Sequence, residues 1–308
     1  MSSRQKLIVI VGPTASGKSE LAVRLAKKFN GEIISADSRQ IYRGLDIGTG
    51  KISKKEMRGV PHHLLNVAEP KQQLTVVGFR RLAGQVVRGI TSRGKIPIIV
   101  GGTGFWIDAL IYNINLPTVP PNSRLRKKLV KKRPAELLKI LQKLDPRRAK
   151  TIEQKNPRRL IRAIEVAKIM GEVPRLVKHS PYNVFWLGLR PSKTVLRRKI
   201  EARAATMIQK GLIKETKKLL RQGMSKKRIQ ELGFEYRGAL SALEQKLPRS
   251  ELLYYLVRYT LKYARRQMVW FRRNSKIHWI RSPSQLNGTN IKKTLFCFLA
   301  SRSHPSKS

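Results

Sequence analysis

Residues Gly12–Ser19 read G-P-T-A-S-G-K-S and directly follow the apolar run Leu7–Val11. This is the P-loop pattern G-x-x-x-x-G-K-[ST], in the strand-to-helix context that gives the pattern its meaning. Its glycines let the backbone turn sharply and aim several N–H groups at one point, where the positive end of the next helix dipole also lies. The pattern predicts a site for linked phosphates, formed by Gly12, Pro13, Thr14, Ala15, Ser16, Gly17, Lys18 and Ser19.

Two side chains of this motif add chemistry to the backbone cradle. Lys18 supplies a flexible positive charge, and the hydroxyl of Ser19 can ligate Mg²⁺. The motif does not reveal the fate of the phosphates. A kinase would transfer a phosphoryl group, an NTPase would hydrolyse one, and a third class of enzyme would expel a whole diphosphate as a leaving group.

The first part of the chain alternates strands with helices. Strands are predicted at 7–11, 32–36 and 96–100, and helices at about 17–29, 76–93 and 105–113. This alternation predicts an α/β fold of the P-loop NTPase type, with a parallel sheet flanked by helices. Ligands bind such sheets at the carboxyl ends of the strands. The P-loop, Asp37 and Thr103 all follow strands, so we expect them to meet at one edge.

The middle of the chain departs from this alternation. Pro117, Pro120 and Pro121 break the pattern, and residues 122–170 are basic and wholly helical in character. The sequence therefore predicts a catalytic core at 1–116, an all-helical insertion at 117–183, and a second part of the core at 184–308. In that second part we expect strands at 184–189 and 277–280, long helices at 192–222 and 250–273, and a polar tail at 301–308.

Composition narrows the choice of partners. The chain has 308 residues, 41% of them hydrophobic, and its 66 Lys and Arg against 18 Asp and Glu give a formal charge of +48. A charge of this size favours a polyanionic partner, and nucleic acid is the natural one. A basic bias shared by all proteins of the source organism is an alternative cause of the magnitude, and both can hold.

Other classes are disfavoured by what the sequence lacks. A single cysteine, Cys297, excludes an internal disulfide and a zinc site built on cysteines. The segment before the first apolar run is too short for a secretory signal, and no apolar run is long enough to span a membrane. We therefore expect a cytoplasmic protein with no membrane partner.

Seven motifs, in their order and spacing, resemble those of the bacterial tRNA dimethylallyltransferases, also called tRNA isopentenyltransferases. The resemblance covers residues from about 6 to 281 and is carried by Gly12–Ser19, Asp37–Tyr42, Asp46–Lys51, Pro61–Leu64, Gly101–Trp106, Asn156–Glu165 and Tyr263–Arg272. It implies transfer of a dimethylallyl group from dimethylallyl diphosphate to N6 of adenosine 37 in tRNA, with Mg²⁺. It also implies that the helical insertion grips the anticodon stem-loop.

The resemblance assigns catalytic roles that fit the chemistry. The exocyclic amine of adenine is a poor nucleophile, so it needs a base, and Asp37 is placed to be that base. Lys18 would neutralise the leaving diphosphate. Thr103 would hydrogen-bond the reacting edge or the diphosphate. Arg203 matches a family arginine near the diphosphate, although from the sequence alone it is one basic residue on a long helix.

The resemblance also implies residues that bind tRNA. An adenine inside a stacked loop must be flipped out to react. The neighbours of Asp37 could then recognise the edge of the flipped adenine or occupy the space that it leaves in the loop. Basic residues of the insertion would hold phosphates. The implied tRNA-binding residues are Asp37, Ser38, Arg39, Gln40, Thr103, Arg126, Arg158, Arg159, Leu160, Ile161 and Arg162. The pair His62-His63 is interpreted as structural, and the active protein is expected to be a monomer.

Three departures from the family are visible, and they leave the shape of the base or prenyl pocket open. The chain has Ile52 after Gly48–Lys51 where the family commonly has proline, Phe105-Trp106 where it has Leu-Tyr, and Gly233–Tyr236 reading G-F-E-Y where it often has Gly-Tyr-(Lys/Arg)-Glu.

Two alternatives stay open at this point. A P-loop kinase or ATPase with RNA-binding activity would often carry an acidic residue at the end of the strand at 96–100, and none stands there. An isopentenyltransferase acting on free adenine nucleotides would have no need of the basic insertion.

Overall fold

The computed structural model describes residues 4–175, 177–288 and 290–301, which divide into two compact units. Unit 1 combines Met1–Asn113 with Ser180–Ser308, and unit 2 is Ile114–His179. The expected insertion at 117–183 thus corresponds to a unit whose bounds lie three or four residues earlier at each end. The polar tail expected at 301–308 lies, apart from Ser301, outside the described residues.

Unit 1 is built on a sheet of six strands in the order β3-β2-β4-β1-β5-β6, and every neighbouring pair is parallel. The strands are β1 (Gln5–Val11), β2 (Gly31–Ser35), β3 (His62–His63), β4 (Ile96–Val100), β5 (Tyr182–Leu189) and β6 (Ile277–Ile280). All strand ends that carry predicted site residues therefore lie along one edge. The expected parallel α/β fold is confirmed.

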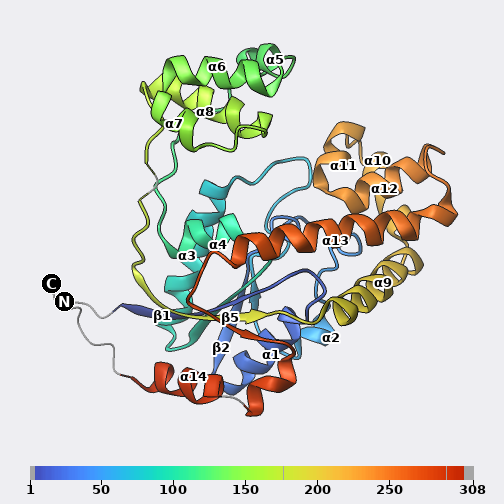
Figure 1. Ribbon diagram of the computed structural model, residues 1–308. Helices are drawn as coiled ribbons and strands as arrows, with labels where there is room; N and C mark the ends of the chain where they lie inside the picture. The colour runs from blue at the N-terminus through green and yellow to red at the C-terminus, as the bar shows by residue number, and fades with distance from the viewer. Residues whose placement is uncertain (1–3, 176, 289, 302–308) are drawn as a thin grey trace. The chain divides into compact units, whose positions relative to one another are not determined.

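Alternate side chains of each strand enter two separate cores, because successive residues of a strand point to opposite faces. Leu7 and Val9 pack into a cluster under α3 (Val76–Ser92), α4 (Gly104–Ile111) and the C-terminal helices. Ile8 and Ile10 pack into a second cluster with α1 (Lys18–Lys28) and α14 (Asn290–Ala300). Figure 1 shows these helices on the two sides of the sheet.

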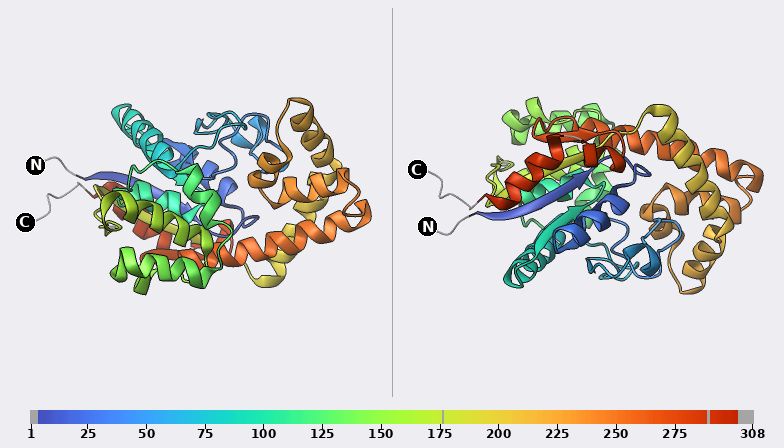
Figure 2. Two further views of the ribbon diagram at one scale, coloured as in Figure 1. Left: turned by 90° about the horizontal axis from the view of Figure 1, so that it is seen from above. Right: turned by 90° about the horizontal axis from the view of Figure 1, so that it is seen from below.

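A helical group lies beyond the end of the sheet in unit 1. It consists of α9 (Lys193–Gln209), α10 (Leu212–Arg221), α11 (Lys226–Leu232) and α12 (Phe234–Leu243), and α13 (Leu252–Phe271) runs from this group back to the sheet (Figure 1 and Figure 2). The remaining short elements of the unit are α2 (Lys54–Met57), η1 (Arg249–Glu251) and η2 (Pro283–Gly288).

The single helix expected at 192–222 is wrong, because two helices occupy this stretch. α9 ends before Lys210, and Gly211 has a φ of 97°, a left-handed conformation that glycine adopts without steric cost. The break lets α10 turn away and place Glu215 beside the segment 46–48, which matters for the site described below.

Unit 2 is wholly helical, as expected from its sequence. It contains α5 (Ser123–Leu129), α6 (Pro134–Leu144), α7 (Pro146–Thr151) and α8 (Pro157–Met170). Three of these helices begin with proline at the first turn, a position that needs no backbone N–H. Their apolar faces share one core around Leu137, Leu141, Leu160 and Ile164. Among the described residues of both units, no helix is both long and apolar enough to cross a membrane.

Candidate active site

The P-loop joins the end of β1 to the start of α1 and encloses a polar cradle. Gly12 lies so close to the carbonyl of Leu189 that a Cβ there would be only 2.5 Å from its oxygen. Ser16 is 1% exposed, and its buried hydroxyl has no hydrogen-bond partner. An unpaired buried hydroxyl is costly. Ser16 is therefore a group that a phosphate oxygen could satisfy, and the cradle fits the ligand class that the sequence predicts.

Lys18 folds back over the loop and carries an unusual charge environment. Its Nζ donates to the carbonyl oxygen of Pro13 at 2.6 Å. Burial and the nearby positive charge of Arg203 lower the pKa of Lys18 to about 7, against an opposing effect of Asp37. These three side chains, far apart in sequence, are thus close enough to interact electrostatically. An anion arriving at the P-loop would favour the charged form of Lys18.

Gln267 of α13 fastens the P-loop to the turn after β4. Its Oε1 accepts from the backbone N–H of Thr14 at 2.8 Å, and its Nε2 donates to the carbonyl of Gly102 at 3.0 Å. Gln267 is 5% exposed; its bond to Gly102 is buried, and its bond to Thr14 is partly buried. The sequence did not predict this role. The available signal is a glutamine on the apolar face of a long helix.

Asp37 and Thr103 meet at the predicted edge of the sheet. Asp37 accepts from the N–H of Arg39 at 2.9 Å, which leaves its other oxygen unengaged by this turn. The Oγ1 of Thr103 accepts from the N–H of Ser38 at 3.1 Å. Tyr263 of α13 lies near Thr103, and burial and the charge of Asp37 raise the pKa of Tyr263 to about 12. Tyr263 was not predicted as a site residue.

Arg39 is held by a carboxylate and two rings. Its Nη1 lies 2.6 Å from Oε2 of Glu235, and its guanidinium lies over Phe234 and Tyr263 at 5.4 and 5.5 Å from the ring centroids. Burial is the largest single effect and lowers the pKa of Arg39, but the negative charge of Glu235, together with smaller effects of Tyr263, Asp37 and Tyr236, makes the net shift upward. Arg39 therefore places a positive charge in a fixed position beside Asp37.

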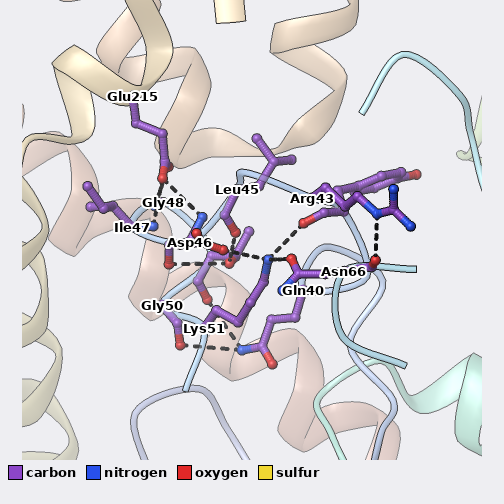
Figure 3. A network of polar contacts seen from close by, with 12 residues as sticks. Gln40, Arg43, Leu45, Asp46, Ile47, Gly48, Gly50, Lys51, Asn66 and Glu215 are labelled. Carbon is purple, nitrogen blue, oxygen red and sulfur yellow. Dashed lines mark hydrogen bonds and ion pairs between the residues drawn. The ribbon is translucent and has the colours of Figure 1, made fainter. Parts of the chain in front are cut away.

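The segment Leu45–Lys51 is organised by Glu215 (Figure 3). One oxygen of this carboxylate accepts from the N–H groups of Asp46 and Ile47 at 3.0 and 2.9 Å. The other oxygen accepts from the N–H of Gly48 and the hydroxyl of Tyr236 at 2.9 and 2.7 Å. Four donors on one carboxylate fix the path of the segment.

The carbonyls of this segment in turn orient two predicted site residues. The carbonyl of Thr49 accepts from Nη2 of Arg203 at 2.9 Å. Gln40 directs its Nε2 to the carbonyls of Thr49 and Gly50 at 3.5 and 3.4 Å (Figure 3). Gln40 is thereby held within the protein, and Arg203 is held where its charge reaches Lys18.

We expect Glu215→Ala to lower the free energy of unfolding by about 3 kcal/mol, because hydrogen bonds to a charged group are strong and the N–H groups left behind are only partly solvated. Glu215→Gln keeps one carbonyl acceptor and should lose less. Urea unfolding followed by circular dichroism measures both. Glu231→Ala, which removes an exposed carboxylate of α11, is the control and should change stability little. Equal losses for Glu215→Ala and Glu231→Ala would contradict this role.

The predicted tRNA-binding residues of unit 2 have different surroundings. Arg126 binds both oxygens of the buried Glu165 at 2.7 and 2.8 Å, and Arg162 lies 3.5 Å from the same carboxylate. Leu160 and Ile161 are 0% and 8% exposed and belong to the core of the unit. Their side chains are therefore not available as a contact surface, because the helical period turns this part of α8 inward.

Arg126 is an exposed residue despite its pairing with Glu165, and two other arginines of this set also lie at the surface. Arg158 is exposed at the start of α8, and Arg159, also exposed, forms an ion pair of 3.0 Å with Glu153. Both stay predicted phosphate contacts.

The histidine pair lies in a structural cluster at the other end of the sheet. His63 contacts Glu32 at 2.7 Å, and Arg93 and Lys95 contact the same carboxylate. Burial raises the pKa of Glu32, but hydrogen bonds from Lys95, Arg93 and His63 more than offset this and lower it to about 2. Within the described residues, no group of three His, Cys, Asp or Glu side chains could hold a metal ion.

Comparisons with known proteins agree with this arrangement. The family model described as IPP transferase matches residues 40–274, and the model described as isopentenyl transferase matches residues 5–69. The tRNA dimethylallyltransferase of Pelotomaculum thermopropionicum is 42% identical over 91% of this chain and 93% of its own length. That of Anoxybacillus flavithermus is 39% identical over 89% and 90% of the two chains.

Solved structures give the same result. A tRNA isopentenylpyrophosphate transferase from Bacillus halodurans superposes with a TM-score of 0.70 at 36% identity and covers 96% of this chain and 95% of its own. A eukaryotic dimethylallyltransferase acting on tRNA superposes with a TM-score of 0.77 at 26% identity, over 99% and 81% of the two chains. The family model and the relatives match most of the length of the chain, including its P-loop and the segment after β2 that contains Asp37. The chain therefore belongs to the IPP transferase family of tRNA dimethylallyltransferases.

Proposed function

We propose that this protein transfers a dimethylallyl group from dimethylallyl diphosphate to N6 of adenosine 37 in tRNA and releases diphosphate. The observation that carries the proposal is the juxtaposition of Asp37 with Lys18 at the carboxyl edge of the sheet. It brings a carboxylate, suited to accept a proton, next to a cradle suited to a diphosphate. The names of the relatives support the same reaction.

The residues divide the chemistry between the two ends of the transferred group. The amine nitrogen forms a bond to the allylic carbon while the bond from that carbon to the diphosphate oxygen breaks. Asp37 accepts the proton that the amine loses. Lys18, the N–H groups of the P-loop and Arg203 stabilise the negative charge that develops on the leaving diphosphate. Thr103, held by Ser38 and near Tyr263, lies where it can orient the reacting edge.

The residues present also fit a bound Mg²⁺. Ser19 is exposed at the first turn of α1, next to Lys18. Because Mg²⁺ binds mostly to phosphate oxygens and water, with one or two protein oxygens, the hydroxyl of Ser19 suffices as its ligand from the P-loop. When bound, Mg²⁺ would supply further positive charge against the diphosphate.

The tRNA would be held by phosphate contacts of unit 2 and by the cationic walls around Asp37. Arg158 and Arg159 lie at the surface, and Arg126 and Arg162 pair with Glu165 while their side chains stay partly exposed, so all four could contact phosphates. We propose that the partner surface of the RNA is the anticodon stem-loop. We also propose that the protein acts on tRNA as a monomer in the cytoplasm.

We expect Arg158→Gln to weaken tRNA binding and to flatten its dependence on salt by about one unit of slope, because one phosphate contact is lost. Filter binding at several salt concentrations gives the slope. Lys27→Gln is the matched control, since Lys27 is exposed at the end of α1 farthest from the P-loop. If both variants alter the slope alike, Arg158 contributes only general charge.

Mass spectrometry of tRNA tests the proposed reaction directly. The protein is incubated with unmodified tRNA, dimethylallyl diphosphate and Mg²⁺, and the nucleosides are then analysed. A gain of one dimethylallyl group on one adenosine is expected. Parallel reactions with AMP and with ATP plus tRNA distinguish the alternatives. Prenylation of AMP but not of tRNA, or phosphate release from ATP without prenylation, would overturn the proposal.

A further inference from the structure

An aromatic ladder, defined here as Tyr255, Tyr259 and Tyr263, runs along one face of α13 toward Asp37. The three tyrosines follow a spacing of four residues, which places them one above the other on a helix. The rings of Tyr255 and Tyr259 lie 4.4 Å apart. Phe234 connects the next step, since its ring lies 6.2 Å from those of Tyr259 and Tyr263.

The ladder is accessible and electropositive. All three tyrosines are partly exposed residues. The ring of Tyr263 at the inner end also has Arg39 over it, at 5.5 Å from the centroid. Lys262 lies over the ring of Tyr259 at 5.3 Å, and Arg266 over that of Tyr263 at 5.7 Å. The sequence of α13 contains no aspartate or glutamate. The nearby carboxylates are Glu235, which is paired with Arg39, and Asp37 at the inner end. Aromatic rings beside cations match single-stranded nucleic acid, whose bases stack while its phosphates pair with the cations.

The ladder also ends at the right place. The guanidinium of Arg39, two residues after Asp37, lies over the ring of Tyr263, and Tyr263 interacts with the charge of Asp37, so the last ring lies near the predicted base. From Tyr255 to Tyr263 the helix rises about 12 Å, and bases stacked at about 3.4 Å per nucleotide would need a similar length for a short run. The ladder is longer than a dimethylallyl group, which could cover only its inner end.

We propose that this ladder is a stacking platform for the unpaired loop nucleotides that flank the target adenosine of the substrate RNA. The inference rests on the proposed transfer to tRNA and adds the place where the opened loop binds. Flipping one adenosine out of a stacked loop leaves its neighbours without a partner on one side. The partly exposed tyrosines would replace that lost stacking and hold the loop open beside Asp37.

Single-turnover prenylation of tRNA at saturating donor tests the platform. Tyr259→Leu removes the central ring and should raise the tRNA concentration needed for half-maximal rate about 5- to 150-fold, because stacking on one ring is worth roughly 1–3 kcal/mol. The rate at saturating tRNA and the KM for dimethylallyl diphosphate should stay close to those of the wild type. Tyr259→Phe keeps the ring and should behave like the wild type.

Two controls separate stacking from folding and from charge. Tyr254→Leu changes a tyrosine that is 69% exposed and leaves α13 in another direction, so it should have little effect. The salt slope of tRNA binding should be unchanged in Tyr259→Leu, because stacking releases no counterions, and lower by about one in Lys262→Gln if that lysine meets a phosphate. Circular dichroism and urea midpoints confirm that each variant is folded.

Fluorescence gives a readout independent of turnover. A tRNA anticodon stem-loop with 2-aminopurine next to the target adenosine should change its emission on binding to the wild type and to Tyr259→Phe, and much less with folded Tyr259→Leu. Equal signals and equal tRNA dependence in all variants would overturn the platform while leaving the transfer reaction intact. A raised KM for the donor alone would assign the ladder to the prenyl group and would also overturn it. Failure of the wild type to prenylate tRNA would instead overturn the proposed function.

Discussion

Asp37→Asn is expected to slow the transfer of the dimethylallyl group by about 10²- to 10⁴-fold, the usual contribution of a positioned general base. The substitution keeps the shape of the side chain and an oxygen that can accept from the N–H of Arg39, so the turn after β2 should persist. What disappears is the capacity to accept the proton of the exocyclic amine. Single-turnover rates at saturating tRNA and donor measure this loss without a contribution from binding.

Binding should survive the same substitution, because the phosphate contacts and the ladder are untouched. The dissociation constant of tRNA should therefore stay within a few-fold of that of the wild type, as filter binding can measure. Glu69→Gln is a suitable control, since Glu69 is an exposed carboxylate paired with Arg43 at the surface. A general base contributes about 10²- to 10⁴-fold to the rate. If the Asp37→Asn variant retains more than about a tenth of the wild-type rate, Asp37 is not the base.

Local sequence patterns were sufficient to predict the edge of the site. The P-loop, Asp37 and Thr103 each directly follow an apolar run, and parallel strands place their carboxyl ends together. This inference needs no knowledge of which strands are neighbours. The order of the strands and the short strand β3 could not be obtained in this way, because they depend on pairing between distant segments.

The residues that hold the edge in shape were beyond prediction from the sequence. Gln267 lies 253 residues after Thr14, and Glu215 lies 169 residues after Asp46, yet each forms direct hydrogen bonds across that distance. A buried polar side chain on an apolar helix face is the only local sign of such a contact. The sign indicates that a partner exists but does not identify it.

The basic segment at the start of α8 shows the opposite limitation. Its charge and its likeness to the family predict a contact with RNA, but they did not separate inward from outward positions. The helical period turns Leu160 and Ile161 into the core and directs Arg162 toward Glu165. Arg158 and Arg159 are left at the surface. Glu165, a buried acid in a very basic unit, is the residue that binds two of the arginines predicted to hold RNA.

Lys18→Met is expected to lower the rate of transfer by about 10²- to 10³-fold, comparable to the loss of one donor that stabilises a developing anion. Affinity for tRNA should change little, because Lys18 lies in the cradle of the donor. The same residue should also make binding of inorganic pyrophosphate depend on pH. Its pKa is about 7 in the free protein, and a bound anion raises that pKa. Binding above pH 7 must therefore take up a proton at Lys18.

The sign of this dependence follows from the proton uptake. As pH rises above 7, more of the free protein carries neutral Lys18, and the affinity for pyrophosphate should fall, by up to about tenfold per pH unit for one proton. Calorimetry in buffers with different ionisation enthalpies measures the protons taken up. Lys18→Arg is the matched control, since arginine stays charged throughout this range. Pyrophosphate loses its own protons identically in both experiments, so the difference between them reports Lys18. If wild type and Lys18→Arg show the same proton uptake at pH 8, then Lys18 is already charged in the free protein and does not gain its proton from the ligand.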